Sequence, residues 1–113
     1  MRIINISKGT VLAAECMQAD SFIKRFRGLM LKPCLPEGRG LLIKPCSSIH
    51  MFFMRFPIDV LFLDKNNMVV YTISNIKPWR ISPLIRNAKS VVELPAGTLQ
   101  KSRTEAGDMI SMI

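Results

Sequence analysis

The sequence lacks a long apolar run, and this absence excludes one class of protein. No window reaches the roughly 18 consecutive apolar residues that a transmembrane helix requires. We also expect no secretion signal in the N-terminal region, because Lys8 interrupts its apolar residues early. We therefore expect a cytoplasmic protein without a membrane partner.

Cysteine and histidine are scarce. The chain has three cysteines, no CxxC pair and one histidine, so a disulfide framework is not expected. Cys46 and His50 lie four residues apart and, with Cys16 and Cys34, could offer three sulfurs and a nitrogen to zinc. Structural zinc ligands usually come as two close pairs, however, and this chain has one. We expect small apolar cysteines and neither a metal nor any other cofactor.

Acidic residues are few. The chain has 16 basic and 8 acidic residues, for a net charge of +8. This excess favours an anionic partner, although a soluble basic surface would look the same. Nucleic-acid binding would require exposed aromatic residues interleaved with the basic ones. The phenylalanines occupy strand-like or helix-face positions that indicate a core, so we do not expect a nucleic-acid partner.

What the chain does have is enough apolar sequence for a core. At 113 residues, 49% of them hydrophobic, it has room for a single domain over residues 1–113. Asp20 and Ser21 predict the start of a helix with Phe26 and Leu29 on its buried face, and residues 99–105 predict a second short helix. Strands are predicted at residues 3–6, 11–14, 41–43, 49–55, 58–63, 68–73, 90–94 and 109–113.

These elements predict an α+β fold, mainly antiparallel β, with one or two short helices. The sheet could roll into a small barrel. Residues 74–87, with two prolines and no clean periodicity, predict a long loop, and such loops are often functional.

The segment 49–64, IHMFFMRFPIDVLFLD, holds polar residues that an apolar core does not easily accept. Alternation places Asp59 on the same face as Leu61, at the buried start of a strand. A buried carboxylate requires partners. The plausible donors are the side chains of Arg27, Arg55 and Trp79. Alternatively, Asp59 binds the backbone and fixes the corner at Pro57.

Two more titratable residues are candidates for chemistry. His50 would be the natural general acid or base, or it is a core histidine bonded to a backbone carbonyl. Glu93 is either an edge-facing charge or a second carboxylate in the pocket of Asp59, as in the acid pairs of glycoside hydrolysis. Trp79, next to Arg80, suits stacking and anion capture, or it packs over a sheet end.

Several motifs occur in an order typical of one family. They are residues 27–30 (RGLM), 50–64 (HMFFMRFPIDVLFLD), 77–80 (KPWR), 92–98 (VELPAGT) and 107–108 (GD). The chain resembles domain-of-unknown-function family 192 over nearly its whole length. The resemblance implies a compact, mainly β domain of bacteria and archaea with no established activity. The residues of this chain that match the shared pattern of the family are Arg27, Met54, Asp59, Glu93 and Gly97.

This sequence also departs from the family. Many members carry a secretion signal, and many have Trp-Met-Lys-Asn-Thr where this chain has Phe-Met-Arg-Phe-Pro at residues 53–57. Any ligand role of that Asn-Thr pair therefore does not transfer to this chain.

We interpret the chain as a binding module for a small polar or anionic ligand. The candidate binding residues are Arg27, His50, Met54, Arg55, Asp59, Trp79 and Glu93. Two alternatives stay open: a domain whose motifs serve only the fold or a protein interaction, and a small acid/base enzyme that uses Asp59, Glu93 and His50.

Overall fold

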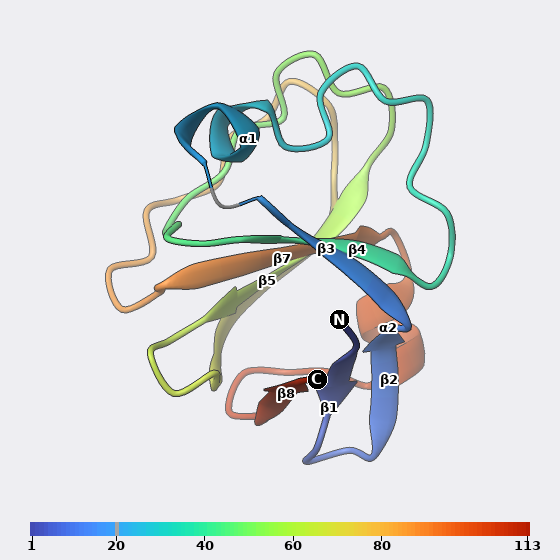
Figure 1. The fold of residues 1–113 in the computed structure, drawn as a ribbon, viewed down its shortest axis with the longest axis vertical. Helices are drawn as coiled ribbons and strands as arrows, with labels where there is room; N and C mark the ends of the chain where they lie inside the picture. The colour runs from blue at the N-terminus through green and yellow to red at the C-terminus, as the bar shows by residue number, and fades with distance from the viewer. Residues whose placement is uncertain (20) are drawn as a thin grey trace.

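The chain forms two β-sheets and two short helices, shown in Figure 1 as a computed structural model that describes residues 1–19 and 21–113. The larger sheet has the strand order β3-β4-β7-β5-β6, and the smaller sheet has the order β2-β1-β8. The elements in chain order are β1 (Ile3–Asn5), β2 (Thr10–Ala13), β3 (Glu15–Ala19), α1 (Phe22–Arg27), β4 (Arg39–Ile43), β5 (Ile58–Leu63), β6 (Val69–Ile76), β7 (Ser90–Pro95), α2 (Thr98–Ser102) and β8 (Ile110–Met112).

The strands pair antiparallel except for β3 and β4, which are parallel. Ala14 alone separates β2 from β3, and these two strands belong to different sheets. The prediction of a mainly antiparallel α+β fold is confirmed. The described strands do not close into a barrel, because they form two separate sheets, each of which ends in two edge strands.

The interior of the larger sheet is buried on both faces, as strand β5 between β7 and β6 shows: all six residues from Ile58 to Leu63 are buried. Alternate residues face opposite sides. Val60 and Phe62 pack with Leu29 of the loop after α1, while Leu61 packs against the smaller sheet and α2. In Figure 1, α1 and the loops lie above the larger sheet, and the smaller sheet and α2 lie below it. No helix in the described part of the chain is long and apolar enough to cross a membrane.

The hairpin β1–β2, strand β5 and strand β7 were predicted within a residue or two. The first helix was also predicted: Ser21 accepts a hydrogen bond from the amide of Lys24, and Gly28 ends the helix. Asp20 lies outside the described residues. Phe26 was wrongly placed on the buried face, because its side chain is 60% exposed.

The strand expected at residues 49–55 is absent. Only His50 forms a bridge, to Ile81, and the rest of the segment is a turn at residues 52–53 and irregular backbone. Its backbone binds the loop after β6 instead, since the amide of Met51 donates to the carbonyl of Arg80. Strand β3 was missed because its outer residues face solvent at the sheet edge and show no apolar alternation.

Candidate functional site

Asp59 is buried and bonds three backbone amides. Its Oδ1 accepts from the amide of Asn75 at 2.8 Å, and its Oδ2 accepts from the amides of Gly97 at 3.0 Å and Leu99 at 2.9 Å. The last two amides belong to the start of α2, whose own N-cap residue supplies no side-chain bond. Asp59 therefore caps α2 from a distant strand and joins it to β5 and β6, which fits the backbone-binding alternative.

Asp59 does not share a pocket with Glu93. Asp59 lies opposite Leu94 in the β5–β7 register, and Val60 lies opposite Glu93. Directly paired residues point to the same face and successive ones to opposite faces, so the two carboxylates lie on opposite faces of the sheet. The paired-carboxylate hypothesis is wrong for this reason. The pairing of Asp59 with Arg27 is wrong as well, because the carboxylate is occupied by backbone amides.

Glu93 is the most unusual group in the structure. It is 4% exposed, and its Oε1 has no hydrogen-bond partner among the described residues. Burial raises the pKa of Glu93 to about 8, so its carboxyl group is mostly protonated at neutral pH. A Cβ built on Gly28 would lie 3.6 Å from Oε1, which places this backbone against the free oxygen.

Glu93 lines a small cavity of about 40 Å³ under α1. Three other candidate residues, Arg27, His50 and Met54, line the same cavity. Four of the seven predicted residues therefore meet at one place. The space suffices for a water molecule or one small polar group.

His50 has both ring nitrogens engaged. Its Nε2 lies 2.9 Å from the carbonyl oxygen of Phe26, which only accepts, so Nε2 carries the proton. Its Nδ1 accepts from the amide of Phe52 at 3.2 Å. The ring joins α1 to the loop after β4, and both of its nitrogens are engaged by backbone groups.

Cys46 also lines the cavity, and sequence reasoning did not select it. Its Sγ donates to the carbonyl of Ser48 at 3.0 Å, and burial raises the pKa of the thiol. The group is therefore a thiol at neutral pH rather than a nucleophilic thiolate. All three cysteines are free, and the described residues contain no group of three or more metal-ligating side chains.

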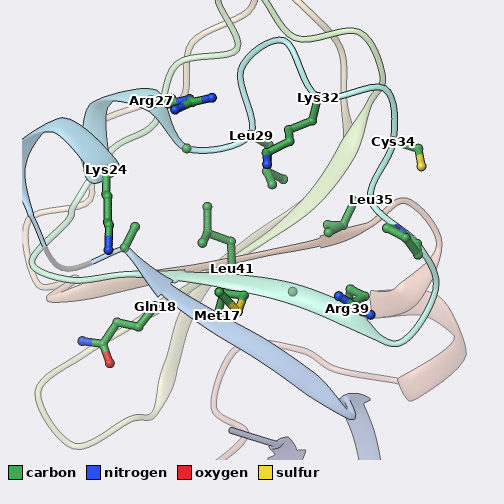
Figure 2. Close-up of a pocket in the computed structure, with 14 residues that line it drawn as sticks. Met17, Gln18, Lys24, Arg27, Leu29, Lys32, Cys34, Leu35, Arg39 and Leu41 are labelled. Carbon is green, nitrogen blue, oxygen red and sulfur yellow. The ribbon is translucent and has the colours of Figure 1, made fainter.

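A larger groove of about 370 Å³ adjoins the cavity along the segment Arg27–Leu29, which lines both. Figure 2 shows Lys24 and Arg27 projecting from α1 and Lys32 from the loop beyond it, across from Met17 and Leu41 on the sheet. The described lining contains no acidic residue. We call this space the basic groove.

The charges of the basic groove are largely uncompensated. Arg39 at its rim pairs with Glu15, with 3.3 Å between Nε and the carboxylate oxygen. For Lys24, Arg27 and Lys32 the described part of the chain shows no side-chain hydrogen bond or ion pair. Leu29 and Leu41 supply apolar walls, so the groove combines cations with apolar surface.

Arg55 and Trp79 lie outside both spaces. Arg55 is exposed. Trp79 is 59% exposed and contacts Phe53, with 4.9 Å between the ring centroids. Neither side chain donates to Asp59, contrary to one of the sequence-based alternatives.

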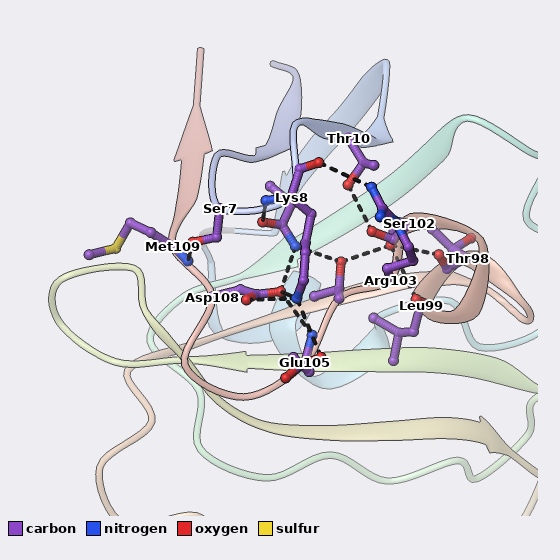
Figure 3. Close-up of polar contacts among 12 residues, drawn as sticks. Ser7, Lys8, Thr10, Thr98, Leu99, Ser102, Arg103, Glu105, Asp108 and Met109 are labelled. Carbon is purple, nitrogen blue, oxygen red and sulfur yellow. Dashed lines mark hydrogen bonds and ion pairs between the residues drawn. The ribbon is translucent and has the colours of Figure 1, made fainter.

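A second polar cluster, drawn in Figure 3, lies beside β1 and α2, and Figure 1 shows these elements across the larger sheet from α1. Asp108 accepts from Asn5 at 2.9 Å and from the ammonium group of Lys8 at 2.9 Å, and its Oδ2 also accepts from the amide of Glu105. Burial alone would raise the pKa of Asp108, but these hydrogen bonds hold it below its usual value. Both carboxylate oxygens of Asp108 accept hydrogen bonds, three of them at Oδ2, so this cluster ties the two terminal segments of the chain together.

The residues that sequence reasoning missed are Lys24, Lys32, Gly28 and Cys46. Lys24 and Lys32 lie on either side of the motif RGLM, so proximity to the motif was the available signal. Gly28 has φ 49° and ψ −123°, a backbone conformation open only to glycine. That conformation turns the chain toward Glu93.

Comparisons with known proteins agree on one family. The family model DUF192, described as an uncharacterized ACR, matches residues 3–112. A UPF0127 protein of Thermococcus sibiricus is 40% identical over 116 residues, which cover 96% of this chain and 72% of that protein. A UPF0127 protein of Pyrococcus furiosus is 39% identical over 115 residues, covering 96% and 95%.

The fold also occurs among solved structures. A protein of unknown function from Novosphingobium aromaticivorans superposes with a TM-score of 0.84 at 19% identity, covering 98% of this chain and 82% of that one. At this identity the likeness concerns the fold alone.

Proposed function

The chain belongs to the DUF192 family, and from this premise we propose that it is a binding domain for a small organic anion held in the basic groove. The anionic group of the ligand binds the cations of the groove, and a hydroxyl or carbonyl group of the ligand reaches the carboxyl group of Glu93. Three positions carried over from the family motifs, Arg27, Met54 and Glu93, line the adjoining cavity.

The observation that carries this proposal is the free oxygen of Glu93. Buried polar groups are almost always hydrogen-bonded, and one without a partner calls for an explanation. An unpartnered buried carboxyl group costs stability that an apolar residue would not. A ligand atom at Oε1 explains why the fold keeps glutamate there.

Groove volume and charge support the same function. About 370 Å³ lies within the range of small-molecule sites. Lys24, Arg27 and Lys32 attract an anion, and Leu29 and Leu41 provide the apolar contact that small organic molecules require.

Thermal shift and calorimetry with defined anions test the proposal. The panel holds inorganic phosphate, a sugar phosphate, and mono- and dicarboxylates, at pH 6.5, where Glu93 is protonated. We expect one class of anion in this panel to raise the melting temperature of the wild type. The double variant Lys24→Gln/Lys32→Gln should bind it at least about tenfold more weakly, because two cation–anion contacts are lost.

Matched control variants distinguish binding in the basic groove from a general effect of the protein's positive charge. Lys65→Gln removes an exposed cation in the turn between β5 and β6 and should leave the affinity unchanged. Glu93→Leu should weaken binding, whereas Glu93→Gln, which keeps a donor, should retain part of it. If no anion in the panel binds the wild type, or if Lys65→Gln weakens binding as much as the groove variant, the proposed function is wrong.

A further inference from the structure

The loop end of the molecule carries a charge asymmetry that the basic groove does not account for. Three segments meet there: residues 21–36, 44–57 and 77–89. They hold four, two and four basic residues and no acidic one. The basic side chains of these segments are exposed, apart from Arg25, which is half-buried. The loop end is therefore strongly cationic.

The same end exposes large apolar side chains. We call them the apolar patch: Phe26 (60% exposed), Leu31 (61%), Phe52 (41%), Phe53 (51%), Trp79 (59%) and Ile81 (66%). The expectation that the phenylalanines form core is wrong for three of them. Apolar groups gathered on one surface usually mark a contact with another molecule or a membrane.

Contacts between the three segments make the patch continuous. The ring of Phe52 contacts Trp79 at 6.0 Å between centroids, and Trp79 contacts Phe53 at 4.9 Å. The amide of Leu31 donates to the carbonyl of Phe53, and Ile81 pairs with His50 in an isolated bridge. The patch is thus one surface built from three parts of the chain.

The backbone holds two of these rings outward at a cost. Phe53 has φ 60° and Trp79 has φ 69°. Positive φ is rare for bulky residues and strains the backbone. Strain of this kind is kept where surrounding structure or function requires it.

From the juxtaposition of the apolar patch with acid-free basic segments, we propose that the loop end docks on an anionic lipid surface. Aromatic side chains prefer the interface between lipid and water, and lysine and arginine bind anionic headgroups. A peripheral contact of this kind needs no membrane-spanning helix. The inference does not depend on the proposed function.

Charge argues against a second copy of this chain as the partner of this surface, and ring packing argues against single-stranded nucleic acid. A second copy of this chain facing the first would bring together two ends that each hold ten basic residues and no acidic one. Single-stranded nucleic acid stacks its bases on open ring faces. Here one face of Phe52 is already taken by the stacked ring of His50, and Trp79 meets Phe52 at a tilt, so the two rings do not form a flat stacking platform.

Trp79 provides the readout, because it is the single tryptophan of the chain. Its emission is measured with vesicles of phosphatidylcholine alone and with vesicles that contain phosphatidylserine. We expect a blue shift and co-sedimentation with the anionic vesicles only. Raising the salt from 50 to 300 mM should weaken binding severalfold, because the basic residues then attract the headgroups less.

Two variants test the two parts of the surface. Phe53→Asn should lower vesicle binding about tenfold, since a large apolar side chain is lost, and should leave the fold intact because asparagine tolerates positive φ. Lys77→Glu/Arg80→Glu should lower it at least as much. Ile6→Ser and Lys65→Glu change an exposed apolar residue and an exposed cation outside the three segments, and both should bind like the wild type.

Each alternative result overturns the proposal. A Trp79 response to a 20-nucleotide single strand without vesicle binding would assign the surface to nucleic acid. Concentration-dependent dimerisation that Phe53→Asn abolishes would assign it to a second copy. Equal binding to neutral and anionic vesicles, or no binding to either, would remove the anionic lipid surface as the partner.

Discussion

Replacing Glu93 with glutamine should stabilise the protein at neutral and alkaline pH. The buried carboxyl group has a pKa of about 8, whereas an exposed glutamate titrates near 4.5. Between these values the unfolded chain has lost the proton that the folded chain still binds. Stability therefore falls as the pH rises through this window.

The magnitude follows from the size of the pKa difference. One pKa unit corresponds to about 1.4 kcal/mol, so the penalty grows to about 3 kcal/mol at pH 7 and about 5 kcal/mol above pH 8. Glutamine has nearly the same shape and cannot ionise, so Glu93→Gln removes the penalty. At pH 8 the variant should be several kcal/mol more stable than the wild type, whereas near pH 4 the two should be similar.

Urea unfolding at half-unit steps from pH 4 to 9 measures this difference, with the m-value as a check that both proteins unfold alike. Glu37→Gln, which removes an exposed carboxylate paired with Lys101, is the control and should keep the slope of the wild type. Burial also raises the pKa of the Cys46 thiol, so Cys46 lowers the stability of the wild type in the same way, but only at higher pH than Glu93. A wild-type profile without this decline, or a variant less stable than the wild type at pH 8, would refute the reasoning.

Three further changes test other parts of the structure. Asp59→Ala should cost about 3–5 kcal/mol in urea unfolding, because it leaves three amides without their acceptor, whereas Asp59→Asn keeps an acceptor oxygen and should cost less. Arg27→Ala should change the free energy of unfolding by at most about 0.5 kcal/mol, since the side chain is exposed; a loss of several kcal/mol would mean that it holds the fold. Asp108→Asn should make stability fall less steeply at acid pH. The pKa of Asp108 is lowered in the folded protein, so its ionised carboxylate stabilises the wild type, and this stabilisation is lost as the pH falls through that pKa. An equally steep fall in the variant would contradict this.

The regular parts of the fold were predictable because local patterns decide them. Strand β5 is apolar in every position except Asp59, and Gly9 turns the β1–β2 hairpin at φ 69°. The edge strand β3 was not predictable, because its pairing with β4 depends on a segment some twenty residues away. Residues 49–55 alternate like a strand but satisfy their backbone through the loop after β6, which no local pattern reveals.

The candidate site was predictable in composition rather than in arrangement. Sequence reasoning selected Glu93 and Asp59 as polar residues in apolar strands, and both are buried. Their roles depend on strand register, which places one against α1 and the other at the start of α2. A one-residue shift in register would exchange the two faces.

Strand β1 has a consequence for the order in which the chain folds. It lies between β2, which follows within a few residues, and β8, which comes more than a hundred residues later. The hairpin β1–β2 can form early, but its outer edge stays unpaired until the last strand arrives. A nascent chain therefore exposes that edge for most of its synthesis, and closure of the smaller sheet is a late event that completes the core beneath it.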